Sequence, residues 1–186
     1  VIGMVGCFKP QKAPLDFIYL GKKIKYELCF KVYFILVGDG ELRPDIERMI
    51  KEYSLQKEVL LLGWRRDIKE IVSIFDILIL TSLWEGLPRV FLEAMVLQKP
   101  IVATDIDGAR EVISHGENGF LVLPHSIDRM MDYVIKLLKD KDLAQRMGQI
   151  GNQKINESFD IEHMVVEIDN LYQEKIKERL GRINFS

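Results

Sequence analysis

Short apolar runs separated by helical patterns dominate the first two thirds of the chain. Six runs have the length of buried strands, and they lie at residues 1–6, 32–37, 59–62, 77–80, 100–104 and 119–123. Between them, apolar residues recur at the three- and four-residue spacing of helices that bury one face. Strands that alternate with helices build a parallel sheet covered on both faces. The pattern therefore predicts an α/β fold with a doubly wound, six-stranded parallel sheet.

The last third of the chain has a helical pattern throughout. We predict extra C-terminal helices over residues 127–139, 143–158 and 162–180. The final helix carries an apolar stripe, which consists of Met164, Val165, Ile168, Leu171, Tyr172 and Ile176. Because water disfavours such a stripe, we expect it to be buried. No repeat or long linker divides the sequence, so residues 1–186 are predicted to form a single domain.

Residues 75–93, FDILILTSLWEGLPRVFLE, join a strand to a helix through a turn. The apolar run ends at residues 81–82, and Pro88 favours the first position of the helix that follows. Glu85 therefore lies in the turn, and Glu93 lies about two helical turns further on. In an open α/β sheet, ligands bind at this carboxyl edge of the strands. The stretch is the first candidate for a functional site.

The start of this helix lacks a capping side chain. If Pro88 is the first helical residue, the N-cap is Leu87, whose side chain cannot accept hydrogen bonds from the N–H groups of Arg89 and Val90. An anion such as a phosphate would satisfy these donors. The hydroxyl of Ser82 is the alternative partner.

Lysines and glycines follow the other predicted strands. Lys9 and Lys12 lie in the loop after the first strand, where they either bind an anion or are ordinary solvated lysines. Glycines follow four strands, at Gly6, Gly38, Gly63 and Gly86. Because glycine has no side chain, these loops allow a ligand to approach the backbone closely along one edge of the sheet.

Composition excludes several classes of protein. A length of 186 residues with 48% hydrophobic residues suits one globular domain, and a net charge of −2 argues against general nucleic-acid binding. No apolar run reaches the length of a membrane span, so we expect a cytoplasmic protein. Cys7 and Cys29 show no metal spacing and indicate buried thiols in a reducing compartment. The start on Val1, inside a strand-like segment, suggests a fragment.

Metal and histidine chemistry receive little support. Asp105 and Asp107 form an Asp-x-Asp pattern that can hold a divalent cation, but loop aspartates beside a glycine are more often turn formers. His115, His125 and His163 are isolated and fit solvated surface histidines. We therefore predict neither a metal nor a cofactor.

Several segments in fixed order together carry a family resemblance. Residues 85–93, EGLPRVFLE, contain a Glu-x7-Glu pattern, and the other segments are KPQK from residue 9, VGDGEL from 37, LGW from 62, PIVATDIDGAREVI from 100 and GENGFLV from 116. The chain resembles the C-terminal, donor-binding domain of the retaining glycosyltransferases of GT-B architecture, the family-four or group 1 enzymes. The resemblance covers nearly the whole chain but only the second half of such an enzyme.

The resemblance implies roles for individual residues. The ligand would be a nucleotide-diphosphate sugar linked to UDP or GDP. Glu85 would bind hydroxyls of the donor sugar, and Lys12 would neutralise charge on the departing nucleoside diphosphate. Glu93 would hold the ribose, and the N–H groups of Arg89 and Val90 would bind the diphosphate. This family works without a metal.

The expected site therefore contains two catalytic residues, Glu85 and Lys12, and a wider donor-binding set. That set is Gly6, Lys9, Gly38, Gly63, Trp64, Arg65, Gly86, Leu87, Pro88, Arg89, Val90 and Glu93. The backbone of residues 63–65 would border the base. Cys7 stands where many members carry Arg, and Pro88 stands where Gly is common, so Lys9 is a candidate second cation at the phosphates.

Partners follow from the same resemblance. A missing N-terminal domain would bring an unknown glycosyl acceptor, so the isolated domain would bind donor and turn over poorly. Two alternatives stay open. One is an inactive nucleotide-binding or partner-interaction module, and the other is a related GT-B sugar-nucleotide epimerase or phosphorylase.

Overall fold

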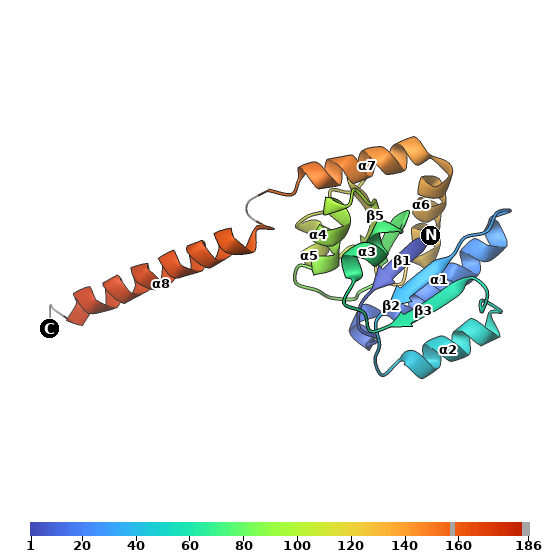
Figure 1. Ribbon diagram of the computed structural model, residues 1–186, viewed down its shortest axis with the longest axis horizontal. Coiled ribbons are helices and arrows are strands. Elements are labelled where there is room, and N and C mark those ends of the chain that lie inside the picture. Colours follow the sequence, from blue (N-terminus) through green and yellow to red (C-terminus); the bar gives the residue numbers. More distant parts are fainter. Residues whose placement is uncertain (157–158, 184–186) are drawn as a thin grey trace. The chain divides into compact units, whose positions relative to one another are not determined.

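The computed structural model describes residues 1–156 and 159–183 and has the predicted α/β architecture (Figure 1). The strands are β1 (Ile2–Val5), β2 (Phe34–Val37), β3 (Val59–Gly63), β4 (Ile77–Leu80), β5 (Ile101–Thr104) and β6 (Gly119–Val122). The helices are η1 (Pro10–Lys12), α1 (Pro14–Glu27), α2 (Arg43–Glu52), α3 (Ile68–Ser73), α4 (Arg89–Val96), α5 (Asp107–Arg110), α6 (Ile127–Lys139), α7 (Lys141–Gln153) and α8 (Ile161–Ile183).

All six strands join one parallel sheet in the order β3-β2-β1-β4-β5-β6. In the central pairs, Ile2 of β1 lies beside Phe34 of β2 and Ile77 of β4. The strand order reverses between β1 and β4, the two neighbouring strands at the centre of the sheet. Doubly wound sheets bind ligands at such a point, outside the carboxyl ends of the strands. The predicted doubly wound, six-stranded sheet is confirmed.

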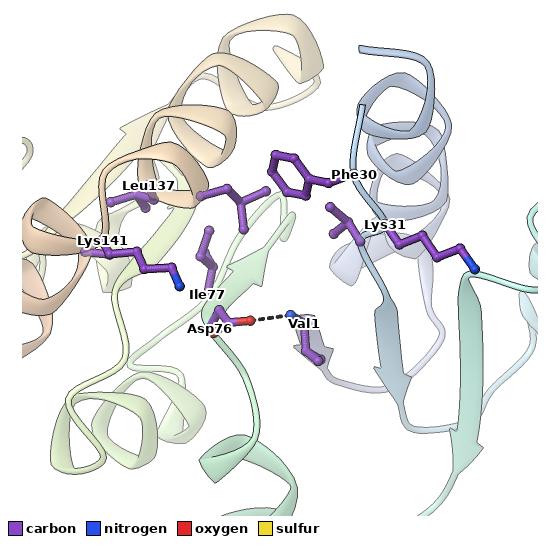
Figure 2. Close-up of a pocket in the computed structure, with 10 residues that line it drawn as sticks. Val1, Phe30, Lys31, Asp76, Ile77, Leu137 and Lys141 are labelled. Carbon is purple, nitrogen blue, oxygen red and sulfur yellow. Dashed lines mark hydrogen bonds and ion pairs between the residues drawn. The ribbon is translucent and has the colours of Figure 1, made fainter. Parts of the chain in front are cut away.

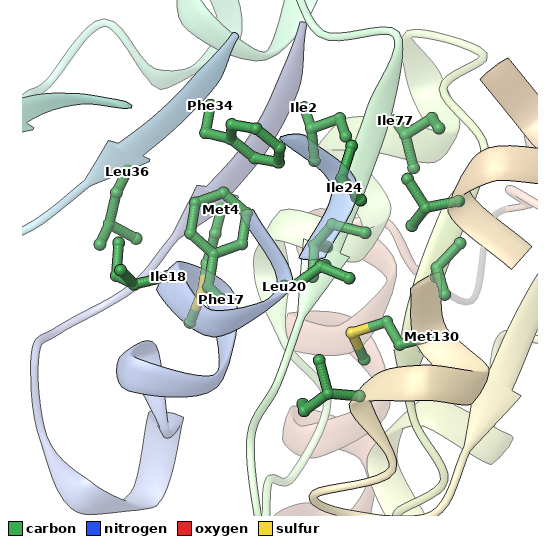
Figure 3. Close-up of a cluster of buried hydrophobic side chains, with 14 of the residues drawn as sticks. Ile2, Met4, Phe17, Ile18, Leu20, Ile24, Phe34, Leu36, Ile77 and Met130 are labelled. Atoms are coloured by element: carbon green, nitrogen blue, oxygen red, sulfur yellow. The ribbon is translucent and has the colours of Figure 1, made fainter. Parts of the chain in front are cut away.

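One face of the sheet carries the main hydrophobic core (Figure 3). Helix α1 contacts both α2 and α6 there. Its inward side chains pack over alternate strand residues, and this cluster includes Ile2, Met4, Phe17, Ile18, Leu20, Ile24, Phe34, Leu36, Ile77 and Met130. On the other face, Gly3 leaves room for the ring of Phe75, since a Cβ at Gly3 would lie 2.0 Å from that ring. Burial of these faces fixes the strand ends that carry the site.

The chain forms two compact units, Val1–Lys154 and Ile155–Ser186. The second unit contains α8, whose six predicted stripe residues are 43–64% exposed. The expected burial of this stripe is therefore wrong for the structure as described. Among the described residues of this unit, no second long helix or strand is present against which α8 could bury an apolar face.

Several element boundaries differ from the predicted ones by a few residues. The apolar spacing after the first strand predicts a helix over residues 14–29, and α1 ends two residues earlier, at Glu27. Helix α7 begins two residues early because Asp140 caps it, with the carboxylate accepting from the Leu143 N–H at 2.9 Å. It ends at Gln153, before the predicted end at 158, and residues 157–158 lie outside the described part.

Both cysteines are exposed and free, so the predicted burial of their thiols is wrong. Cys7 follows β1 and Cys29 follows α1, and both positions are loops. Within the described residues, no helix combines the length and apolar character that crossing a membrane requires.

Candidate functional site

Glycines bring the loops after β1, β2 and β3 into direct backbone contact. The N–H of Gly38 donates to the carbonyl of Gly63 at 2.8 Å, and a Cβ on Gly38 would lie 1.9 Å from the carbonyl oxygen of Gly6. Gly38 and Gly63 also have φ values of 134° and 66°, which side chains disfavour. At these three positions the absence of side chains lets the loops contact one another, and the predicted approach of a ligand stays a prediction.

The loop after β1 is bound to the loop after β4. The N–H of Leu83 donates to the carbonyl of Gln11 at 2.7 Å, and the side-chain amide of Gln11 donates to the carbonyl of Trp84 at 2.9 Å. The hydroxyl of Thr81 lies 2.8 Å from the carbonyl oxygen of Lys12 and 2.9 Å from that of Ala13. These bonds hold two loops, some seventy residues apart in sequence, in one arrangement.

Lys12 and Glu85, the two predicted catalytic residues, form an ion pair between these loops. Their side chains are only 16% and 11% exposed. Shielding from water strengthens a charge pair and makes removal of either partner costly. The structure therefore places a largely buried, charge-compensated pair at the point where the strand order reverses.

Helix α4 begins beside this pair without a side-chain cap. Pro88 is its N-cap, so the expected N-cap at Leu87 is wrong by one residue, and no side chain hydrogen-bonds to the first turn. The alternative cap also fails, because the buried hydroxyl of Ser82 has no hydrogen-bond partner. The N–H groups of Arg89 and Val90 lie in this uncapped first turn, where a helix favours an anion.

A cavity of about 700 Å³ opens in front of α4. We call it the basic cavity, and the charged residues that line it are Lys12, Arg65, Arg66, Lys69, Glu70, Arg89 and Glu93. Five cations against two carboxylates give this lining a formal charge of +3. Pro88 and Val90 also line it. Such a lining favours a polyanion, with the carboxylates left to accept hydrogen bonds from hydroxyls.

A smaller cavity of about 260 Å³ shares Trp64 and Arg65 with the basic cavity and is lined further by Gly6, Cys7 and Gly38. Trp64 is 70% exposed at this junction. An exposed indole beside a shallow cavity provides a flat apolar surface with low conformational entropy.

Asp67 holds Arg65 in place through two hydrogen bonds, one of them from Nε to Oδ1 at 2.8 Å. The hydrogen bonds from Arg65 lower the pKa of the Asp67 carboxyl, which keeps it ionised. Arg66 and Lys69 were not predicted, although the basic residues of the segment WRRDIK directly after Gly63 are a signal for them.

Most other predicted residues lie in or beside these cavities. Glu93 lines the basic cavity, with its side chain 32% exposed and 3.9 Å from the guanidinium of Arg89. Gly86 and Leu87 form the turn that precedes α4. Lys9 is exposed and lines neither cavity, so the structure does not bring it to Lys12.

Asp105 and Asp107 face a guanidinium. Arg110 donates two hydrogen bonds to Asp105, at 2.7 and 3.1 Å, and lies 3.8 Å from Asp107. These hydrogen bonds lower the pKa of the Asp105 carboxyl. Across residues 1–156 and 159–183, no group of three or more His, Cys, Asp and Glu side chains is arranged to hold a metal ion.

A further cavity, of about 370 Å³, lies at the opposite edge of the sheet (Figure 2). Its lining includes Phe30 and Lys31 before β2, Ile77 at the start of β4, and Leu137 and Lys141 from α6 and α7. These positions mark the amino ends of the strands, so this cavity is separate from the site around Lys12.

Comparisons with known proteins identify the family to which the chain belongs. The family model described as "Glycosyl transferases group 1" matches residues 1–154. A UDP-Gal:alpha-D-GlcNAc-diphosphoundecaprenol alpha-1,3-galactosyltransferase from Escherichia coli is 36% identical over 174 residues, which cover 92% of this chain and 45% of that enzyme. The chain thus spans less than half the length of this relative.

Solved structures show the same fold. A mutant of TarM from S. aureus, in complex with Fondaparinux, alpha-GlcNAc-glycerol and UDP, matches with a TM-score of 0.86 at 27% identity, over 92% of this chain and 35% of that one. HepE from Anabaena, in complex with UDP-glucose, matches with a TM-score of 0.81 at 26% identity, over 95% and 48% of the two chains. With the family match over residues 1–154, these findings show that the chain belongs to the group 1 glycosyl transferases.

Proposed function

We propose that this chain is the donor-binding half of a retaining glycosyltransferase and that it binds a nucleotide-diphosphate sugar. The observation that carries the proposal is the meeting of the Lys12–Glu85 ion pair with the uncapped start of α4 at the edge of the basic cavity. A diphosphate is the anion whose charge and size suit that combination.

Each part of the donor has a matching group in this proposal. The diphosphate lies against the N–H groups of Arg89 and Val90, while Lys12 neutralises its charge. The carboxylate of Glu93 accepts hydrogen bonds from the ribose hydroxyls. The base lies toward the loop of residues 63–65. The names of two similar proteins, a UDP-galactose-dependent enzyme and a structure that contains UDP-glucose, support a nucleotide-sugar ligand.

In the reaction, the bond from C1 of the sugar to the diphosphate oxygen breaks, and negative charge grows on the leaving nucleoside diphosphate. Lys12 and the start of α4 stabilise that charge, which lowers the barrier. Glu85 holds hydroxyls of the sugar and so fixes C1 relative to the acceptor. No step in this account uses a metal.

Transfer requires more of the protein than this chain. Because the chain spans 45% of the similar galactosyltransferase, we propose that the remaining half binds the acceptor and closes the cleft over the donor. The isolated chain then binds donor and turns over poorly.

A second candidate function is a nucleotide-binding or interaction module without catalysis. One observation favours it: Lys9 does not line the basic cavity, so no second cation from the β1–α1 loop stands beside Lys12. The Lys12–Glu85 pair would then serve stability alone.

Calorimetry with UDP- and GDP-sugars tests donor binding. We expect Lys12→Ala and Glu93→Ala to weaken the affinity for the preferred donor about tenfold or more, which corresponds to about 1.4 kcal/mol. Glu47→Ala is the matched control, because Glu47 is an exposed acid on α2 that pairs with Arg43 and lines neither cavity. A wild-type chain that binds none of these nucleotides would rule out the proposal.

Sugar transfer separates the two candidates. Joined to the remaining half of its protein, the chain should transfer sugar, and Glu85→Gln should reduce the rate about a hundredfold or more. Transfer that is unaffected by this substitution would contradict the role of Glu85. No transfer despite donor binding would favour the module.

A further inference from the structure

A cavity of about 290 Å³ is lined by Glu85, which does not line the basic cavity. We call it the Trp84 cavity, and its lining includes Trp84, Glu85, Asp105, Asp107 and Arg110. Lys12 lines the basic cavity and its ion-pair partner Glu85 lines the Trp84 cavity, so the two cavities adjoin at that pair. None of the roles assigned above uses Trp84, Asp107 or Arg110.

We propose that the Trp84 cavity holds the sugar ring of the donor and that Trp84, Asp107 and Arg110 determine which sugar is accepted. The inference rests on the proposed function, because it assumes that a nucleoside diphosphate occupies the basic cavity. A ligand that crosses the Lys12–Glu85 pair then places its diphosphate on one side and its sugar on the other.

The walls of the Trp84 cavity are fixed by backbone contacts. Gly108 in α5 lies so close to the Glu85–Gly86 turn that a Cβ there would come within 1.4 Å of the Gly86 carbonyl oxygen. The side-chain amide of Gln11 also donates a hydrogen bond of 2.9 Å to the backbone carbonyl of Trp84. The cavity is therefore preorganised, which reduces the ordering cost of binding.

The exposed groups of the cavity match the chemistry of a pyranose. The indole of Trp84 is 58% exposed and offers an apolar face for the C–H side of a sugar ring. Asp105 binds Arg110 through Nε and Nη2, which leaves the Nη1 donors directed to Asp107 at 3.8 Å or to a ligand. A carboxylate that accepts and a guanidinium that donates are the partners that sugar hydroxyls need.

Charge indicates the class of sugar. The cavity lining contains three carboxylates, those of Glu85, Asp105 and Asp107, and one cation, Arg110, which gives the lining a formal charge of −2. Lys12 pairs with Glu85 from outside this lining, so the pair and the lining together still carry −1. This charge favours a neutral hexose or N-acetylhexosamine and disfavours a uronic acid.

The chain has two tryptophans, Trp64 and Trp84, which provide a matched pair of variants. Calorimetry compares the affinity for a free nucleotide with that for its sugar nucleotides: UDP with UDP-glucose and UDP-N-acetylglucosamine, and GDP with GDP-mannose. We expect Trp84→Ala to weaken sugar-nucleotide binding at least fivefold and to leave binding of the free nucleotide within twofold. Trp64→Ala should weaken both, because Trp64 lines the basic cavity.

Arg110→Ala should behave like Trp84→Ala. Its control is Arg129→Ala, because Arg129 is a similarly exposed arginine that pairs with Asp132 and lines none of the four cavities described above. UDP-glucuronate should bind the wild-type chain at least fivefold more weakly than UDP-glucose. Tighter binding of the uronate would overturn the assignment of sugar class.

Saturation-transfer NMR supplies a direct readout of the sugar. Saturation should reach the sugar protons and the base protons in the wild-type chain, and only the base protons in Trp84→Ala. Absence of sugar signals in a wild-type chain that binds the nucleotide overturns this inference and leaves the proposed function standing. Equal losses of nucleotide and sugar nucleotide in Trp84→Ala also overturn it. Failure of every nucleotide to bind removes both proposals.

Discussion

Thr81 and Ser82 are adjacent, fully buried hydroxyl residues at the end of β4, and their hydroxyls differ in one respect. The hydroxyl of Thr81 bonds to the backbone of the β1–α1 loop, whereas that of Ser82 has no partner. A buried hydrogen bond contributes about 1 kcal/mol, and an unpaired buried polar group costs a similar amount or more. Two neighbours of similar chemistry thus affect stability in opposite directions.

We therefore expect Thr81→Val to lower the free energy of unfolding by about 1–2 kcal/mol, because it leaves backbone carbonyls of residues 12 and 13 without that donor. Ser82→Ala should leave stability unchanged or raise it slightly. Urea titration of the two variants and the wild type measures the difference. Equal destabilisation by both would contradict the assigned hydrogen bonds.

Helices α5 and α7 each dock through a glycine that touches a backbone carbonyl. Gly108 of α5 faces Gly86 in the site, and Gly148 of α7 faces Gln98 after α4, where a Cβ would lie 1.9 Å from the carbonyl oxygen. Neither carbonyl can move as a side chain would, so the helix itself must shift.

Alanine at either glycine should therefore cost about 1–3 kcal/mol of stability. Only Gly108→Ala should also weaken sugar-nucleotide binding, since α5 walls the Trp84 cavity and α7 does not. Thermal unfolding and calorimetry on both variants check this, with Gly148→Ala as the control for stability. Unchanged donor binding in a folded Gly108→Ala chain would show that α5 does not position the turn.

The elements show how far the sequence alone predicts the molecule. The strand pattern predicts all six strands because strands buried on both faces require continuous apolar runs. The edge strand β3 has such a run too, although its Leu60 is 53% exposed. The Glu-x7-Glu segment likewise identifies the start of α4. The contacts of Thr81, Gln11 and Gly108 were not predictable, because they join loops that are distant in sequence and depend on backbone geometry rather than on any local pattern.

Two predictions of burial made from the sequence are wrong, that of the α8 stripe and that of the cysteine thiols. The apolar stripe of α8 predicts that one face of the helix is covered, but the sequence does not indicate which element covers it. The exposure of the two cysteine thiols depends on the paths of the loops that carry them, which no local pattern predicts.

Lys9 and Lys12 are three residues apart in one loop, but only Lys12 lines the basic cavity, because η1 turns the chain between them.

At the scale of the whole molecule, the first unit contains everything that the proposed site needs. The buried core residues extend no further than Met147, and the family match ends at residue 154. A chain shortened to residues 1–154 should therefore keep its unfolding temperature within about 2 °C and its nucleotide affinity within twofold. A drop of more than about 5 °C would mean that the stripe of α8 stabilises the first unit.

The Lys12–Glu85 ion pair implies an order of events. While the pair is closed, each charge compensates the other, and neither is available to a ligand. A diphosphate that binds first competes for Lys12 and releases the carboxylate of Glu85, which can then turn to sugar hydroxyls. Recognition of the sugar would thus follow occupation by the nucleotide, so a free monosaccharide would meet a site whose main acceptor is still engaged.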